Sequence, residues 1–199
     1  MHLQRSLYET AEQKAHAPIL IILICSLVLG FVFELTCTGV ERLTHRRQYR
    51  ETVSAYAAQY GIPEAAVFAL IKRESNFDST KQGKNGEIGL LQLTPALYTQ
   101  LANQEHDTAI NAAALYDPDT NLHYGTMYLA RLYRKYGMWS TVYAAWYAGE
   151  ETVDAWLANP DLTDPDFGTL LVIPDKTVAR AAKRAVKTME LYEKLYYAK

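Results

Sequence analysis

The residue best suited to chemistry is Glu74, in the sequence IKRESNF. It lies one helical turn beyond Leu70 and Ile71, on the face that those apolar residues are expected to bury. A carboxylate directed toward an apolar surface loses hydration, which favours its neutral form and raises its pKa. A raised pKa suits a general acid near neutral pH. The alternative is a glutamate at a helix end that pairs with Lys72 or Arg73, and spacing alone does not decide between these interpretations.

Helices are expected to position Glu74, because apolar residues from residue 51 onward recur mostly at helical spacings. One expected helix ends at Gly61, and the next runs from Pro63 to Glu74. Two further helices are expected to start at Pro95 and at Pro118. Another helical region follows Gly137, with a break near Gly149. A last helix is predicted from about Pro174, and its buried stripe consists of Val178, Ala182, Ala185, Met189, Tyr192 and Tyr196. Period-two alternation is nearly absent. The fold is therefore predicted to be mainly α, with at most a small β element.

Composition excludes several classes of protein. The chain has 199 residues, which fits one domain plus an appendage. Hydrophobic residues make up 49% and charged residues 21%, a balance that excludes a disordered chain. The net charge of -2 gives no basic signal, so no nucleic-acid partner is expected. Two cysteines and five scattered histidines, without an HExxH motif, argue against a disulfide scaffold and a zinc hydrolase.

Two polar loops interrupt the helical pattern. Residues 78–87, DSTKQGKNGE, follow the helix that carries Glu74, and the acidic segment NPDLTDPDFG begins at Asn159. The second loop superficially suggests a calcium site through Asp161, Asp164 and Asp166. Pro165 and the missing ligand spacing argue against it, so no metal site is predicted.

An apolar run near the N-terminus predicts a membrane anchor. Residues 17–33, APILIILICSLVLGFVF, carry no charge, and the run reaches residue 40 only by including Glu34. No small-x-small cleavage site follows, and ELTC before Cys37 is a poor lipobox, so an uncleaved signal anchor is favoured. We therefore expect a tail over residues 1–16, a transmembrane helix over 17–40, a basic linker over 41–50 and a domain over 51–199.

Charge leaves the orientation of this anchor open. Four arginines follow the run, at positions 42, 46, 47 and 50, whereas Arg5 and Lys14 precede it. The positive-inside rule alone would keep the C-terminal side in the cytoplasm. A long following domain can be translocated despite such charges.

Four segments in a fixed order carry a family resemblance. IKRESNF is followed by GEIGLLQLTP, then by DPDTNLHYGTMYLARL and then by AAWYAG. In these motifs the chain resembles the transglycosylase SLT domain of the lytic murein transglycosylases, glycoside hydrolase family 23. The resemblance is good from about Val53 to Gly149 and loose over the last fifty residues. It implies a lysozyme-like, mainly α fold.

The resemblance also implies an activity. The substrate would be the β-1,4 bond between N-acetylmuramic acid and N-acetylglucosamine in peptidoglycan glycan strands. Glu74 would protonate the glycosidic oxygen and then act as a base, while the C6 hydroxyl of the substrate attacks to give a 1,6-anhydromuramyl product. No metal or organic cofactor would be needed. Residues assigned to substrate binding are Ser75, Gly89, Leu91, Gln92, Trp146 and Tyr147. The catalytic domain would then lie on the extracytoplasmic side of the cell membrane, with cell-wall or secretion machinery as further partners.

A second catalytic carboxylate is not evident. Most glycosidases use two. Asp78 lies four residues after Glu74 but at the end of the predicted helix, and Glu87 lies in a loop whose backbone it is suited to orient. A mechanism assisted by the substrate tolerates the absence of a second acid.

The sequence departs from the family pattern at two places. The family usually reads Ala-Tyr-Asn-Ala-Gly where this chain has Trp146 and Tyr147 in the middle positions. Near the C-terminus an ungapped match puts Ala181 where the family has a tyrosine that assists the catalytic glutamate. Tyr143 or Tyr147 is a candidate to replace that tyrosine.

Two alternatives stay open, the first because of these departures and the second because the same fold can support hydrolysis. The first is a peptidoglycan-binding module that no longer cleaves its ligand. The second is a hydrolase that resembles goose-type lysozyme and uses a water with a second carboxylate, from Asp78 or from the loop over residues 161–166.

Overall fold

The computed structural model describes residues 25–33, 36, 39–107 and 110–198. The chain divides into two units, Met1–Arg46 and Arg47–Lys199. In the first unit, residues 25–33 are helical and carry exposed apolar side chains such as Leu27 and Phe33. Among the described residues, no helix combines the length and apolar character needed to cross a membrane. Residues 17–24 of the expected anchor lie outside the described part, so the transmembrane helix stays a prediction.

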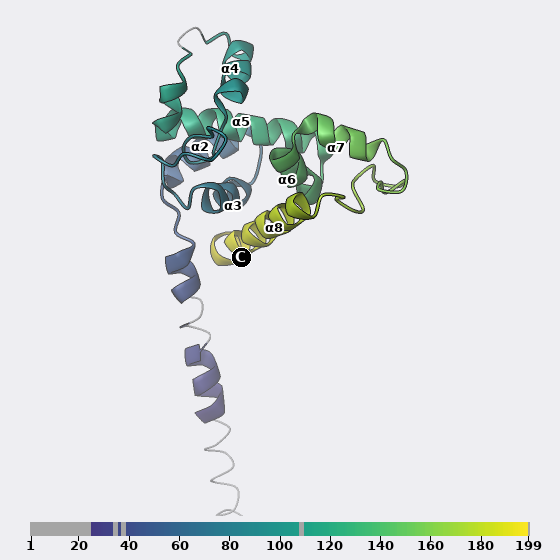
Figure 1. Ribbon diagram of the computed structural model, residues 1–199. Coiled ribbons are helices and arrows are strands. Elements are labelled where there is room, and N and C mark those ends of the chain that lie inside the picture. Colours follow the sequence, from purple (N-terminus) through teal and green to yellow (C-terminus); the bar gives the residue numbers. More distant parts are fainter. Residues whose placement is uncertain (1–24, 34–35, 37–38, 108–109, 199) are drawn as a thin grey trace, which may run out of the picture. The chain divides into compact units, whose positions relative to one another are not determined.

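The second unit is helical, as Figure 1 shows. Its elements are α2 (Arg50–Tyr60), α3 (Glu64–Glu74), α4 (Pro95–Gln104), the 3-10 helix η1 (Ala112–Tyr116), α5 (Pro118–Tyr136), α6 (Trp139–Ala148), α7 (Glu150–Leu157) and α8 (Lys176–Tyr196). Within the described ranges the only β features are isolated bridges, which pair Gln82 with Ile88, Ile88 with Leu93 and Thr163 with Leu170. The prediction of a mainly α fold is confirmed.

Local chemistry explains where these helices begin. The side chains of Thr94, Asp117 and Asp175 each accept a hydrogen bond from a backbone N–H in the first turn of α4, α5 and α8, respectively. Such caps satisfy donors that have no partner within the helix. Proline follows the cap of α4 and of α5, at a position where its missing N–H costs nothing. The last helix begins at Lys176 rather than at Pro174, because Asp175 forms its cap.

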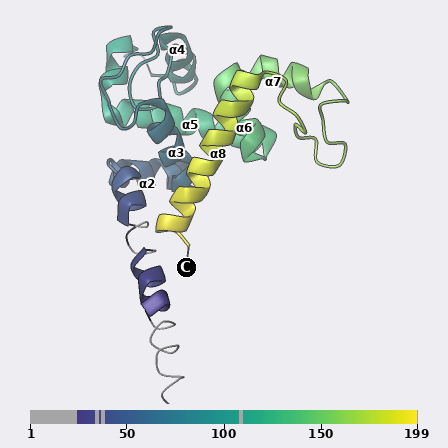
Figure 2. The ribbon, with the colours of Figure 1, turned by 60° about the horizontal axis from the view of Figure 1, so that its bottom comes forward.

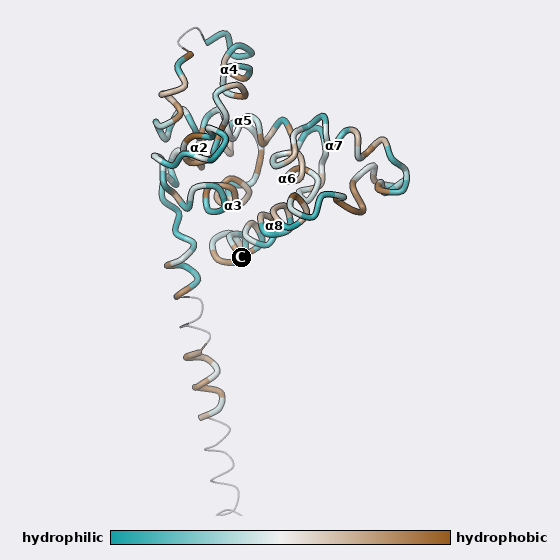
Figure 3. The backbone as a smooth tube through the Cα atoms, in the orientation of Figure 1, coloured by the Kyte–Doolittle hydropathy of each residue, from teal (hydrophilic) through white to brown (hydrophobic). Residues whose placement is uncertain are grey.

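Helix α3 lies at the centre of the core. All seven residues from Ala65 to Ile71 are buried. Helix α8 packs on α3 and on α6, and α2 packs on α3 and α5 (Figure 2). Figure 3 shows hydrophobic residues alternating with hydrophilic ones along α8, as expected for a helix with one buried face. The ring of Phe68 stacks on that of Tyr192 at 5.4 Å. This packing fixes the end of α3, where Glu74 is the last helical residue.

Candidate functional site

Glu74 is held half-buried at the end of α3. Its Oε1 atom is buried and makes no hydrogen bond to any described residue. Burial is the largest influence and raises the pKa of Glu74, and the charge of Glu87 adds to this effect. Tyr147, Lys81 and Arg73 act in the opposite direction but do not overcome burial. The direction of the pKa shift predicted from the sequence is therefore confirmed.

Glu74 does not form the ion pair with Lys72 or Arg73 that was the alternative interpretation of its sequence. No ion pair of Glu74 occurs within the described part of the chain. The Lys72 ammonium donates a hydrogen bond to the side-chain oxygen of Asn76 at 2.7 Å. Arg73 lowers the pKa of Glu74 through its charge but does not bridge to it.

Tyr147 from α6 is the immediate neighbour of the Glu74 carboxyl group. A hydrogen-bond interaction between the two side chains lowers the pKa of Glu74 and contributes to raising that of the Tyr147 phenol. Burial is the largest cause of the raised pKa of Tyr147, so this phenol stays protonated and acts as a donor. Tyr143 lies one turn earlier on α6, and its hydroxyl donates to the Ala66 carbonyl in the core at 3.3 Å. Of the two candidates, Tyr147 is the one that lies at Glu74.

Glu74 opens onto a cleft of about 640 Å³. Helices α3, α4, α5 and α6 and the loop between α3 and α4 contribute its walls, with Glu74, Lys81, Gln92, Tyr128, Trp146 and Tyr147 among the lining residues. The structure thus brings together four of the residues that the sequence predicted for the site, namely Glu74, Gln92, Trp146 and Tyr147.

Gln92 is anchored by its own amide group. Its Nε2 donates to the carbonyl oxygens of Gly89 at 2.8 Å and Lys81 at 3.1 Å. Its backbone has a φ of 49°, which few residues other than glycine adopt. Both amide hydrogens are used, so the group that Gln92 offers to a ligand is its side-chain carbonyl oxygen.

The other three predicted binding residues do not line the cleft. The Ser75 hydroxyl is buried, donates to the Ile71 carbonyl at 3.2 Å and accepts from the Phe77 N–H at 3.1 Å. Leu91 is fully buried in the core. Gly89 packs so closely on Asn121 that an added Cβ would come within 2.3 Å of its side-chain nitrogen. These residues shape the walls of the site, and the prediction that they contact substrate has no support in their positions.

Asn121 on α5 organises the loop that carries Gln92. Its side-chain nitrogen donates to the carbonyls of Ile88 and Leu115, each at 2.9 Å, and its oxygen accepts from the Leu91 N–H at 2.8 Å. Sequence reasoning noted Asn121 only as part of a motif. Its role follows from full burial, because a buried amide must find partners for its polar atoms.

Tyr128 was missed by the sequence analysis. It lies on α5, 18 residues before Trp146 in the sequence, and the two rings approach to 5.5 Å with a tilt of 42°. Both residues line the cleft. Aromatic faces arranged in this way suit contacts with the apolar faces of sugar rings. The one signal available from the sequence was the presence of Tyr128 in the third motif of the resemblance.

The remaining acids are engaged elsewhere or lie apart from the cleft. Glu87 lines the cleft but accepts hydrogen bonds from the backbone and the side chain of Asn85, each at 3.0 Å, so it orients its loop as expected. Asp78 is exposed and accepts two hydrogen bonds from Thr80. Asp164 accepts from the backbone N–H groups of Asp166 and Phe167.

Over the described residues, no group of three histidine, cysteine, aspartate or glutamate side chains could hold a metal ion.

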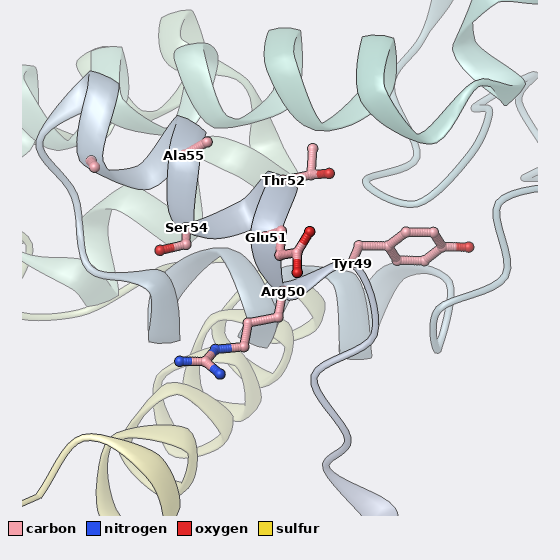
Figure 4. Close-up of a pocket in the computed structure, with 7 residues that line it drawn as sticks. Tyr49, Arg50, Glu51, Thr52, Ser54 and Ala55 are labelled. Atoms are coloured by element: carbon pink, nitrogen blue, oxygen red, sulfur yellow. The ribbon is translucent and has the colours of Figure 1, made fainter.

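A larger hollow, of about 800 Å³, lies at the start of α2 (Figure 4). Its lining includes Tyr49, Arg50, Glu51 and Thr52. None of the residues predicted for catalysis or binding belongs to it. Size alone therefore does not identify the site, whereas the half-buried acid does.

This helical domain, with a half-buried glutamate in a cleft, has the fold of known lytic transglycosylases. The 70 kDa soluble lytic transglycosylase of Escherichia coli aligns with a TM-score of 0.71 and 23% identity over 80% of this chain and 26% of that one. The family model of the transglycosylase SLT domain matches residues 51–165. The chain belongs to this family.

Two curated relatives are similar over about half of the chain. One is the soluble lytic murein transglycosylase of Escherichia coli K12, with 29% identity over 115 residues, which make up 56% of this chain and 18% of the relative. The other is membrane-bound lytic murein transglycosylase C of Actinobacillus pleuropneumoniae, with 33% identity over 92 residues, or 45% of this chain and 25% of the relative. The chain thus spans a quarter or less of the length of these relatives.

Proposed function

We propose that this chain is a lytic transglycosylase that cleaves the β-1,4 bond between N-acetylmuramic acid and N-acetylglucosamine in peptidoglycan. The observation that carries the proposal is Glu74, a half-buried acid with a raised pKa and an unpartnered oxygen, open to a cleft. Membership of the SLT family and likeness to lytic murein transglycosylases support the substrate class.

Glu74 acts first as an acid and then as a base. The neutral carboxyl group donates its proton to the glycosidic oxygen, and the bond between that oxygen and C1 of the muramyl sugar breaks. The C6 hydroxyl of the same sugar then attacks C1 and gives its proton to the Glu74 carboxylate. A 1,6-anhydro ring forms, the acid is regenerated and no water is consumed.

Tyr147 positions the acid in this scheme. Its phenol interacts with the Glu74 carboxyl group and stabilises the carboxylate that exists between the two proton transfers. We assign to it the task performed elsewhere in the family by the tyrosine that Ala181 replaces. Gln92, Tyr128 and Trp146 bind the sugars, whereas Ser75, Gly89 and Leu91 hold the walls of the cleft in place.

A single acid favours transglycosylation over hydrolysis. A hydrolase would need a base for water. Of the acidic residues described, Glu87 is the one that shares the cleft with Glu74, and it is bonded to Asn85.

The anchor belongs to the same proposal. Residues 17–40 hold the chain in the cell membrane as a single-pass signal anchor, and residues 41–50 link it to the domain over residues 51–199. Because peptidoglycan lies outside the cytoplasm, the domain is on the extracytoplasmic side.

The test is mass spectrometry of muropeptides released from purified sacculi by the full chain in detergent. Glu74→Gln, which keeps the size of the side chain but removes the acid, is the control. Anhydro-ended products that are absent from the control support the proposal. Products heavier by one water would assign a lysozyme-type hydrolase, and binding without any Glu74-dependent product would assign a non-catalytic module.

A further inference from the structure

A further hollow, of about 410 Å³, meets the cleft at Glu74, the catalytic acid of the proposed function. Arg73, Glu74 and Tyr147 line both hollows, so these residues form their common boundary. The far side of the further hollow is formed by the first turns of α8, where Arg180 and Arg184 contribute. We call it the arginine pocket, after Arg73, Arg180 and Arg184.

The arginine pocket carries an excess of positive charge. Glu74 is the one acid that lines it, and burial favours its neutral form. None of the three arginines takes part in an ion pair with any described residue. The Nε of Arg180 donates to the Lys176 carbonyl at 3.1 Å, which leaves its terminal nitrogens available. Three guanidinium groups around one space, none of them in an ion pair with a described residue, suit an anionic ligand.

The small side chain of Ala181 opens this space. Ala181 lines the pocket between Arg180 and Arg184, which lie one helical turn apart on α8. A larger side chain at this position would extend into the hollow beside Glu74. The alanine thus leaves room next to the acid, and the three arginines surround that room.

The position of the pocket also bears on catalysis. Arg73 lowers the pKa of Glu74 through its charge, which opposes the role of an acid. An anion bound between the arginines would offset this effect and help to keep Glu74 protonated. A ligand that arrives with the substrate would couple this effect to binding.

We propose that the arginine pocket binds a carboxylate of the peptide stem on the muramyl sugar next to the cleaved bond. This inference rests on the proposed function. The N-acetylated sugars of the strand are neutral, whereas the stem carries free carboxylates and is attached two carbons from the C1 that reacts. A guanidinium matches a carboxylate through two parallel hydrogen bonds. The substrate class is therefore a stem-bearing glycan strand with unmodified carboxylates.

The test compares two substrates for the full chain in detergent: strands that carry stems, and bare strands from which an amidase has removed the stems and whose newly exposed lactyl carboxylates have then been converted to amides. The variant Arg180→Gln/Arg184→Gln empties the far side of the pocket of charge. The matched control is Lys183→Gln/Lys187→Gln, which removes the same charge from the same helix outside the pocket; all four side chains are exposed. The readout is the ratio of kcat/KM for stem-bearing strands to kcat/KM for bare strands.

We expect the arginine variant to lower this ratio roughly 10-fold, as for the loss of charge-assisted hydrogen bonds to one carboxylate. The lysine variant should change it by less than about 2-fold, since Lys183 and Lys187 do not line the pocket. Amidation of the stem carboxylates should lower the activity of the unmodified chain and leave that of the arginine variant nearly unaffected. An unchanged ratio in the arginine variant would overturn the inference. If the same variant also bound anionic lipid vesicles more weakly, the arginines would be assigned to lipid headgroups instead. Failure of the unmodified chain to cleave either substrate would instead contradict the proposed function.

Discussion

The phenol of Tyr147, on α6, makes a hydrogen-bond interaction with the carboxyl group of Glu74, at the end of α3. The two residues are 73 positions apart in the sequence. Burial and this phenol have opposite effects on the acid: burial raises its pKa, and the hydrogen-bond interaction lowers it. The balance leaves a group that can hold a proton before the reaction and release it during the reaction.

Replacing Tyr147 by phenylalanine should raise the pKa of Glu74, because a group that stabilises the carboxylate is lost. In the pH profile of kcat/KM, the alkaline limb reports deprotonation of the acid, so it should move to higher pH. The maximal kcat/KM should fall by about 10- to 100-fold, because the acid is less well positioned. Rates of anhydro-product release across the pH range measure both effects.

Tyr143→Phe is the matched control for this prediction. It removes a hydroxyl one turn earlier on α6, where the partners are the Ala66 carbonyl and the Met189 sulfur. It should lower the free energy of unfolding by about 1 kcal/mol and leave the pH profile in place. A Tyr147→Phe profile that coincides with that of Tyr143→Phe would contradict the role assigned to Tyr147.

Features set by neighbouring residues could be predicted from the sequence. Helix starts at Asp117 and ends at Gly61 follow from capping chemistry, and the raised pKa of Glu74 follows from apolar residues one turn away. Features that depend on distant segments could not. Leu91 belongs to the core rather than to the cleft because Asn121, 30 residues away, holds its backbone.

The place of Tyr128 in the cleft could not be predicted from the sequence either. Its position near Trp146 depends on how α5 packs on α6, which no local pattern encodes. The partner of Glu74 had two candidates on α6, and only the packing of that helix distinguishes Tyr147 from Tyr143.

Replacing Asn121 by alanine should lower the free energy of unfolding by about 3 kcal/mol. Two buried carbonyls, of Ile88 and Leu115, and the Leu91 N–H would lose their partners, and unsatisfied buried groups are costly. Urea unfolding followed by circular dichroism measures the change. Asn85→Ala, in the exposed part of the same loop, should cost less than about 1 kcal/mol. Equal effects of the two substitutions would show that Asn121 does not organise the loop.

Replacing Gly125 by alanine should destabilise the domain, although alanine favours helices. The added Cβ would lie 2.3 Å from Cδ1 of Leu91, which is fully buried. Overpacking of this kind costs about 1–3 kcal/mol. Shortening Leu91 to alanine removes the clash. The double variant should therefore lose less free energy of unfolding than the sum of the losses in the two single variants. Strictly additive free energies of unfolding would mean that the two residues do not compete for the same space.

Replacing Glu74 by glutamine should stabilise the folded chain at neutral pH while it abolishes cleavage. The pKa of Glu74 is higher in the folded state than the ordinary value, so folding favours the protonated form. The penalty for the charged form is therefore absent below the ordinary pKa of about 4.5 and grows as pH rises toward the folded-state pKa. Each unit of elevation corresponds to about 1.4 kcal/mol. Urea unfolding at pH 4 and at pH 7 measures this difference: the variant should exceed the unmodified chain in stability at pH 7 and match it more closely at pH 4. A stabilisation that is the same at both pH values would mean that the acid is not held in a site that disfavours its charge.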